Sequence, residues 1–326
     1  MSKDVFVFVE SKEGTVRKVP LELLSKGKEI AGHLASRLHA VVIGHQIKEM
    51  AESLKVYSDS VIVVDNELLK EYSWDIYTAV FAELIKRYDP GMVFGPSTVT
   101  GKDFFPRLAA RLKSPMVSDA IDIDFNDGKV KIKKPLFGGK IISWIECRSD
   151  SMIFITFRPN SFSIGADDLN GAIVEEQIEV ARDPRINIVS VEKTISKKVD
   201  LQEADFIICG GRGMNGPENF QVLEEIADLM NGRVGASRSV VDSKWREYDD
   251  QIGKSGKTVS PKLYMGCGVS GALHHIMGMD TSKVIVAINK DPNAPIFQYA
   301  DYGVVCDMFE LLPVLKNELR AVKEEV

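Results

Sequence analysis

The segment DFIICGGRGMNG, from Asp205 to Gly216, decides how the second part of this 326-residue chain folds. Its apolar run Phe206–Cys209 has the length and composition of a buried strand, and the run ends in closely spaced glycines. Pro217 then opens the stretch ENFQVLEEIADLM, in which apolar residues recur with the 3.6-residue period of a helix. The order strand, glycine turn, helix predicts the first βα unit of a nucleotide-binding domain.

The glycines of this turn have the spacing of a dinucleotide-binding fingerprint. Gly211, Gly213 and Gly216 match G-x-G-x-x-G, a turn that lets backbone approach a phosphate at a helix N-terminus. The acidic residue that usually contacts a ribose after the next strand is missing, and GASR, Gly235–Arg238, stands in its place. An arginine there suits a phosphate or the electron-rich edge of a ring. A purely structural turn and a surface salt bridge of Arg238 stay open as alternatives.

Strands and helices are expected to alternate from the start of the chain to Leu112. The expected strands are Val5–Glu10, Ala40–Gly44, Ser60–Val64 and Met92–Gly95, and the expected helices are Pro20–Leu38, Ile47–Leu54, Asp75–Tyr88 and Lys102–Leu112. This order is typical of a doubly wound parallel sheet. The next four expected strands look antiparallel or mixed, with Asn126-Asp127-Gly128 as a hairpin turn: Ala120–Phe125, Lys129–Lys133, Lys140–Glu146 and Ser151–Phe157.

The alternation restarts near Asp205, after the polar stretch SVEKTISKKVDLQEAD, which is interpreted as a connector. Further strands are expected at Arg233–Ala236, Lys262–Cys267, Lys283–Asn289 and Val304–Cys306, and helices at Gly271–Met277 and Met308–Glu324. The predicted fold is therefore α/β with two domains, residues 1–193 and 194–326. Each has a mainly parallel doubly wound sheet, and the C-terminal one is Rossmann-like.

Polar residues follow several strands of the second domain. Because the carboxyl ends of parallel strands meet at one edge of a sheet, Arg212, Arg238, Ser270, Asn289 and Asp307 are expected to face one ligand crevice. No serine-nucleophile elbow, zinc motif or acid–base pair accompanies them. That pattern favours a protein whose reactive part is a bound cofactor.

A second glycine-rich stretch, QIGKSGKT, nearly matches an ATP-binding Walker A loop. It has Gln251 where the spacing requires glycine, and the preceding WREYDD is not a buried strand. A loop that offers backbone N–H groups and a serine hydroxyl to a cofactor fits better.

Composition excludes several classes of function. A formal net charge of -6, with dispersed basic residues, argues against bulk nucleic-acid binding. No apolar run approaches the roughly 20 residues that span a bilayer, so no membrane insertion is expected. The four cysteines lie far apart without a C-x-x-C motif, which predicts reduced thiols and a cytoplasmic protein. The five histidines, with no carboxylate cluster beside them, predict no metal site.

The run from Gly210 to Pro313 resembles the alpha subunit of electron transfer flavoprotein. The motifs that carry the resemblance are GGRG at 210–213, GASR at 235–238, GKTV at 256–259, PKLY at 261–264, CGVSGALHH at 267–275 and VIVAINKDPNAPIFQYADYGVV at 284–305. GKDFFPRLAARL at 101–112 and FRPNSF at 157–162 agree more loosely. The chain departs by reading GKSGK where many relatives read GQTGK, and by His274 where many have Gln.

The resemblance implies an FAD-binding C-terminal domain and an N-terminal domain that packs on a beta subunit. It implies electron transfer from a dehydrogenase, such as an acyl-CoA dehydrogenase-type flavoenzyme, or electron bifurcation from NADH with a second FAD in the beta subunit. A stand-alone NAD(P)-dependent oxidoreductase is the alternative. The implied FAD-binding residues are Arg212, Ser237, Arg238, Gln251, Ile252, Gly253, Lys254, Ser255, Ser270, Gly271, Ala272, Leu273, His274, His275, Asn289, Asp307 and Met308.

Overall fold

The chain forms two compact units, each of which is described by itself. The structure is a computed structural model and describes residues 4–12, 14–126, 129–147, 152–165, 168–191 and 199–325. The N-terminal unit comprises residues 1–136 and 140–193, and the C-terminal unit comprises 194–326 with 137–139. The predicted boundary after residue 193 falls within 192–198, outside the described residues.

A seven-stranded parallel sheet organises the N-terminal unit, in the order β12-β5-β4-β1-β6-β11-β7. Its strands are β1 (Val5–Phe8), β4 (Leu38–Gly44), β5 (Ser60–Asp65), β6 (Met92–Pro96), β7 (Met116–Ala120), β11 (Ile153–Phe157) and β12 (Ala172–Glu175). The helices of this unit are α1 (Lys18–Leu34), α2 (Lys48–Ser53), α3 (Trp74–Tyr88) and α4 (Val99–Arg111), with 3-10 turns at Lys55–Tyr57 and Glu67–Leu69.

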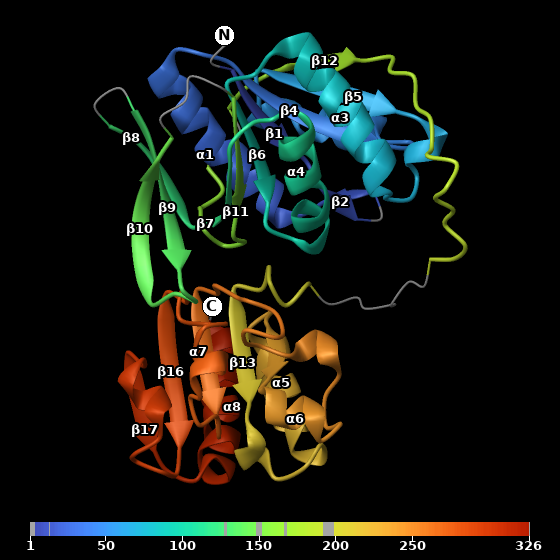
Figure 1. Cartoon of the computed structure of the whole chain (residues 1–326). Helices are drawn as coiled ribbons and strands as arrows, with labels where there is room; N and C mark the ends of the chain where they lie inside the picture. Colours follow the sequence, from blue (N-terminus) through green and yellow to red (C-terminus); the bar gives the residue numbers. More distant parts are fainter. Residues whose placement is uncertain are drawn as a thin grey trace. The chain divides into compact units, whose positions relative to one another are not determined.

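Helices cover both faces of this sheet because its strands are apolar on both sides. Successive residues of a strand point to opposite faces. Val5 and Val7 therefore pack in the core that includes α1, whereas Phe6 and Phe8 pack against α3 and α4 (Figure 1). The predicted doubly wound architecture is confirmed for this unit.

Some elements of the N-terminal unit differ from the sequence-based expectation. The antiparallel strands β8 (Asp122–Asn126), β9 (Lys129–Leu136) and β10 (Ile141–Glu146) form a separate meander, as expected. The predicted turn residues 127 and 128 lie outside the described residues. The expected fourth member of this group is instead β11, which is parallel and lies between β6 and β7. A short apolar run has the same composition in either sheet, so the sequence did not distinguish them. Strands β7 and β12 and the small pair β2 (Ser11–Lys12) and β3 (Thr15–Val16) were not predicted.

Polar side chains pair with one another at the switch point of the first sheet, where the strand order reverses between β1 and β6. The buried Glu10 carboxylate accepts a hydrogen bond from Thr98 Oγ1 at 2.6 Å and pairs with Arg17 at 3.1 Å. Thr98 Oγ1 also accepts from the Gly101 N–H and so caps α4. These contacts occupy the edge at which open α/β sheets usually hold ligands.

A five-stranded parallel sheet organises the C-terminal unit, in the order β14-β13-β15-β16-β17. Its strands are β13 (Phe206–Gly210), β14 (Arg233–Ala236), β15 (Leu263–Cys267), β16 (Val284–Asn289) and β17 (Tyr302–Val305). Its helices are α5 (Gln221–Leu229), α6 (Arg238–Asp242), α7 (Leu273–Ile276) and α8 (Met308–Glu325), with 3-10 turns at Arg212–Met214, Glu218–Phe220, Tyr248–Asp250 and Pro295–Gln298. All five predicted strands are confirmed, whereas the helix expected over Gly271–Met277 is only the short α7.

This sheet is also covered on both faces. Ile208 and Val234 pack in the core that contains α5 and α8 (Figure 1). Ile207 and Cys209 face the opposite core, which Ile252 and Ile276 close. In chain order the strands are arranged 2-1-3-4-5, so the topological switch point lies between β13 and β15, and a ligand is expected outside their carboxyl ends.

Facing glycines set the distance between the two loops at this switch point. The Gly211 N–H donates to the Cys267 carbonyl at 2.9 Å, and the Gly213 N–H donates to the Gly268 carbonyl at 3.2 Å. A Cβ atom on Gly211 would lie 2.1 Å from the Gly268 oxygen. Two glycines of the fingerprint thus make room for backbone of the neighbouring loop, a role that the motif alone does not indicate.

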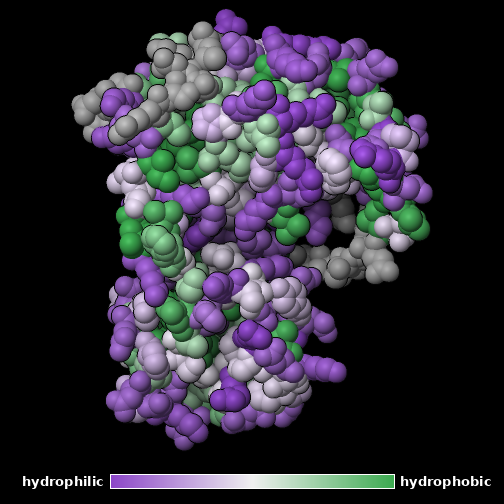
Figure 2. Space-filling model, in the orientation of Figure 1, coloured by the Kyte–Doolittle hydropathy of each residue, from purple (hydrophilic) through white to green (hydrophobic). Residues whose placement is uncertain are grey.

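The surface carries one exposed apolar strand in the N-terminal unit. Ile141, Ile142 and Trp144 of β10 are each about half exposed. Figure 2 shows apolar surface over this strand. Across the described part of the chain, no helix combines the length and apolar character that crossing a bilayer requires.

Gly211→Ala should destabilise the C-terminal unit by about 2 kcal/mol, because the added methyl group overpacks against fixed backbone. Hydrogen–deuterium exchange of the β13 and β15 amides measures the change. Gly216→Ala is the matched control, since its Cβ would meet the flexible carboxylate of Glu218. Equal exchange in the two variants would contradict the role assigned to the facing glycines.

Candidate functional site

A cavity of about 670 Å³ opens at the carboxyl edge of the second sheet. Loops after β13, β14, β15 and β16 all contribute to its wall, as the switch-point rule predicts. The predicted residues that line it are Arg212, Ser237, Arg238, Ile252, Gly253, Lys254, Ser255, Ser270, Ala272, His274, His275 and Asn289. A volume of this size is typical of sites for cofactors and other small molecules.

A smaller cavity of about 110 Å³ holds two of the remaining predicted residues, Asp307 and Met308. Asn289 lines both cavities, so the two adjoin. Asp307 already has a structural role, because its Oδ1 accepts the Phe309 N–H at 2.8 Å at the start of α8. Asp307 thus lines the smaller cavity, whereas Arg238 lines the larger one.

The last three predicted residues support the wall without lining the larger cavity. Gln251 is buried and donates from Nε2 to Ser255 Oγ at 3.1 Å. Gly271 has a positive φ of 84° and lies so close to Ile296 that a Cβ would be 2.3 Å from its nitrogen. Leu273 is 47% exposed and lies between the lining residues Ala272 and His274.

The loop from Gln251 to Lys257 is a closed turn fixed to α7. The Lys257 N–H donates to the Gln251 carbonyl at 2.7 Å, and the Gly256 N–H donates to the Gly253 carbonyl at 3.0 Å. The Lys254 N–H donates to the His274 carbonyl at 2.7 Å. A Walker A loop leads directly into a helix, but no helix begins directly after this turn. The loop is thus a wall segment held by backbone hydrogen bonds.

His275 is a buried, neutral imidazole with one free ring nitrogen. Its Nε2 lies 2.7 Å from the Tyr264 hydroxyl, and its Nδ1 is buried with no hydrogen-bond partner among the described residues. Desolvation lowers the pKa of His275 to about 4, and the nearby Ile252 backbone opposes that shift only in part. A buried polar atom without a partner at a cavity wall indicates a place for a ligand atom.

Positive charge at the cavity is only partly paired. Arg238 forms a long ion pair with Asp242 at 3.4 Å, and both side chains are mostly exposed. Arg212 and Lys254, both exposed, make no ion pair with any described residue. Asp291 adds a carboxylate to the lining. Cations that face an open cavity suit a phosphate-bearing ligand.

Several lining residues were not among those predicted, notably Asn215, Ser239, Asp291 and Pro295. Asn215 has a positive φ of 62°, a conformation that asparagine adopts readily at the end of a turn. Its position before Gly216 in the glycine turn was a signal in the sequence that Asn215 could line the cavity. Asp291 and Pro295 follow Asn289 closely, so proximity in sequence to a predicted strand end was the available signal.

The residues present fit a dinucleotide cofactor. Two adjoining cavities along the strand ends offer an extended site, unpaired cations face the larger one, and a buried Nδ1 lacks a partner there. The described residues contain no group of three or more His, Cys, Asp and Glu side chains that could hold a metal ion.

Comparison with protein families agrees with this geometry. Residues 5–202 match the model described as the electron transfer flavoprotein domain. Residues 200–280 match the model described as the electron transfer flavoprotein FAD-binding domain. The second match covers β13 through α7 and therefore most of the cavity wall. The cofactor of the C-terminal unit is FAD.

Curated relatives extend over nearly the whole chain. An electron transfer flavoprotein subunit alpha of Bacillus subtilis is 41% identical, covering 98% of both chains. The subunit alpha of Thermoanaerobacterium thermosaccharolyticum is 38% identical, covering 98% of this chain and 99% of the relative. An acryloyl-CoA reductase electron transfer subunit beta of Anaerotignum propionicum is 34% identical, covering 99% and 96%. The chain therefore belongs to the electron transfer flavoprotein alpha-subunit family.

Proposed function

We propose that this chain is the FAD-carrying subunit of a heterodimer that passes electrons from an acyl-CoA-oxidising flavoenzyme to an acceptor. The observation that carries the proposal is the cavity at the β13–β15 switch point, where cations and a buried, unpartnered His275 nitrogen meet. The Anaerotignum relative, an electron transfer subunit of an acryloyl-CoA reductase, supports a partner that acts on acyl-CoA compounds. The unpaired cysteines favour a reducing compartment, and we place the protein in the cytoplasm.

In this proposal each part of the wall binds one part of FAD. Arg212, Ser237, Arg238 and the loop from Gln251 to Ser255 hold the flavin. Ser270 to His275 hold the pyrophosphate and ring, and Asn289, Asp307 and Met308 hold the adenosine part in the smaller cavity. Bound FAD supplies reversible uptake and release of electrons.

The chain's own contribution is electrostatic. Guanidinium and ammonium groups at a cavity wall stabilise negative charge that develops on a bound ring during reduction. His275 contributes a hydrogen bond without adding charge, because its lowered pKa keeps the imidazole neutral near pH 7. If the Tyr264 hydroxyl donates to Nε2, the single proton of the neutral ring lies on Nδ1.

The family implies a beta subunit, and we propose that the N-terminal unit packs on it. The exposed apolar residues of β10 support this, because an apolar strand at the edge of a three-stranded sheet is typical of a surface covered by a partner. Electron bifurcation from NADH is the alternative to simple electron transfer within the same heterodimer.

Co-expression with its beta subunit tests the proposed function. We expect a yellow heterodimer that is reduced by an acyl-CoA dehydrogenase in the presence of its substrate. One FAD plus AMP per heterodimer indicates the simple carrier, and two FAD indicate bifurcation. A protein that retains nicotinamide and no flavin would overturn the proposal in favour of an NAD(P)-dependent oxidoreductase.

Arg238→Ala should weaken FAD binding about 10- to 150-fold, because a hydrogen bond to a charged group contributes about 1.5–3 kcal/mol. The flavin midpoint potential should fall, since less positive charge then stabilises the reduced form. Equilibrium dialysis and reductive titration measure these effects. Arg320→Ala on α8 removes the same charge at an exposed site outside the cavity and is the control. Equal losses in both variants would count against the assigned site.

His275 should make the stability of the C-terminal unit depend on pH. Its pKa is lower in the folded state, about 4, than in the unfolded chain, about 6.5. Stability is therefore fully present above pH 6.5 and is lost as the pH falls toward 4, by about 3 kcal/mol. Urea unfolding of wild type and His275→Gln between pH 4 and 8 isolates this contribution. A constant difference between the two proteins over that range would refute the assignment.

A further inference from the structure

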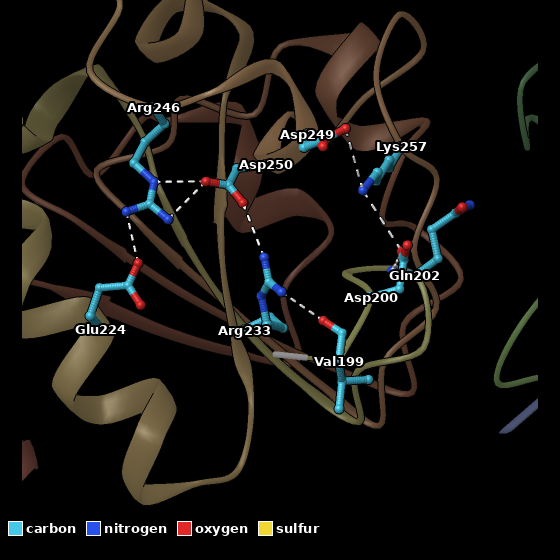
Figure 3. A network of polar contacts seen from close by, with 9 residues as sticks. All are labelled: Val199, Asp200, Gln202, Glu224, Arg233, Arg246, Asp249, Asp250 and Lys257. Carbon is cyan, nitrogen blue, oxygen red and sulfur yellow. Dashed lines mark hydrogen bonds and ion pairs between the residues drawn. The ribbon is translucent and has the colours of Figure 1, made fainter. Parts of the chain in front are cut away.

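A buried carboxylate stands directly before the loop that lines the FAD cavity. Asp250 ends the 3-10 turn Tyr248–Asp250, and its side chain is 10% exposed. One of its oxygens accepts from Arg233 Nη2 at 3.3 Å, and the other accepts from Arg246 Nε at 2.9 Å (Figure 3). Each carboxylate oxygen thus has its own guanidinium partner, which is what makes burial of such a charge tolerable.

The two arginines connect Asp250 to the rigid part of the C-terminal unit. Arg233 is the first residue of β14, and Arg246 Nη1 pairs with Glu224 of α5 at 2.7 Å. The guanidinium of Arg246 also lies 5.6 Å from the centre of the Phe220 ring. Through these two arginines, Asp250 is therefore connected to strand β14 and to helix α5.

The same network reaches residues 199–204, where the described part of the chain resumes after residue 191. Arg233 Nη1 donates to the Val199 carbonyl at 2.7 Å (Figure 3). Lys257 Nζ lies 3.8 Å from both Asp200 and Asp249. Gln202 Nε2 donates to the Thr258 carbonyl at 3.1 Å. Segment 199–204 is thus attached to residues on both sides of the loop Gln251–Ser255, which is called the cavity loop below.

Packing joins the same parts. Leu201 and Ala204 are buried in the core that contains Ile252 and Val259. Ile252 in turn donates its N–H to the Ala236 carbonyl at 2.9 Å, at the end of the strand that Arg233 begins. Movement of segment 199–204 would consequently displace the side chains beneath the cavity loop, and separate buried charges from their partners.

We propose that Asp250 is a positioning residue for the FAD loop, and that the Asp250–Arg233 pair couples this loop to the point where the chain enters the C-terminal unit. This inference rests on the proposed function, because it takes the cavity beside Gln251–Ser255 as the FAD site. Asp250 does not line the cavity. It acts through the loop, whose position a supporting shell must fix for a cofactor to bind in one geometry.

The test compares Asp250→Asn, Arg233→Gln and the double variant in the heterodimer. Hydrogen–deuterium exchange of segments 199–204 and 251–258 is measured without FAD, and FAD affinity and the flavin midpoint potential are measured with it. Lys316→Gln provides the matched control. It breaks an equally well-formed ion pair, with Glu225 at 2.7 Å, between α8 and α5 in the same unit.

We expect Asp250→Asn to speed exchange in both segments together and to weaken FAD binding about tenfold, with a shifted potential at saturating FAD. The double variant should lose less than the sum of the single losses, because both changes break one pair. Lys316→Gln should change exchange in α5 and α8 alone.

Independent exchange of the two segments, or additive losses, would overturn the coupling. An Asp250→Asn variant with unchanged affinity and potential would overturn the positioning role. If wild type binds no FAD, the proposed function fails, whereas the exchange experiment still decides the coupling.

Discussion

The close contact between the loops after β13 and β15 is the constraint on which the FAD site depends. Gly211 and Gly268 meet backbone to backbone, so neither loop can withdraw without opening a gap between adjacent strands. That contact fixes the spacing of the two loops from which Arg212 and Ser270 line the cavity. Backbone packing, and not the presence of a phosphate, is thus sufficient to require glycine at these positions.

Arginine has two different roles in the C-terminal unit. Some arginines fix the position of the backbone, and others are available to bind the cofactor. Arg233 and Arg246 are mostly buried and satisfied by Asp250, where they hold a turn in place. Arg212 and Arg238 are exposed at the cavity, and neither pairs with a buried acceptor among the described residues. A residue that is to bind an anionic cofactor must keep donors available, whereas one that fixes backbone must not.

The sequence predicted the parallel sheets and the gathering of strand ends because both follow from local periodicity and one topological rule. Arg212, Ser270 and Asn289 meet for that reason. It did not predict that β11 joins the large sheet, since a strand with four apolar residues out of five suits either kind of sheet. It also missed the partner of Gly211 and the separation of Asp307, because both depend on contacts between segments distant in the chain.

The two parallel sheets use the same topological position in different ways. At the switch point of the N-terminal unit, Glu10 accepts from Thr98 Oγ1 and pairs with Arg17, so these three side chains satisfy one another. At the switch point of the C-terminal unit, Arg212 and Lys254 form no ion pair with any described residue. One switch point thus contributes internal cohesion, whereas the other keeps positive charge available for a ligand.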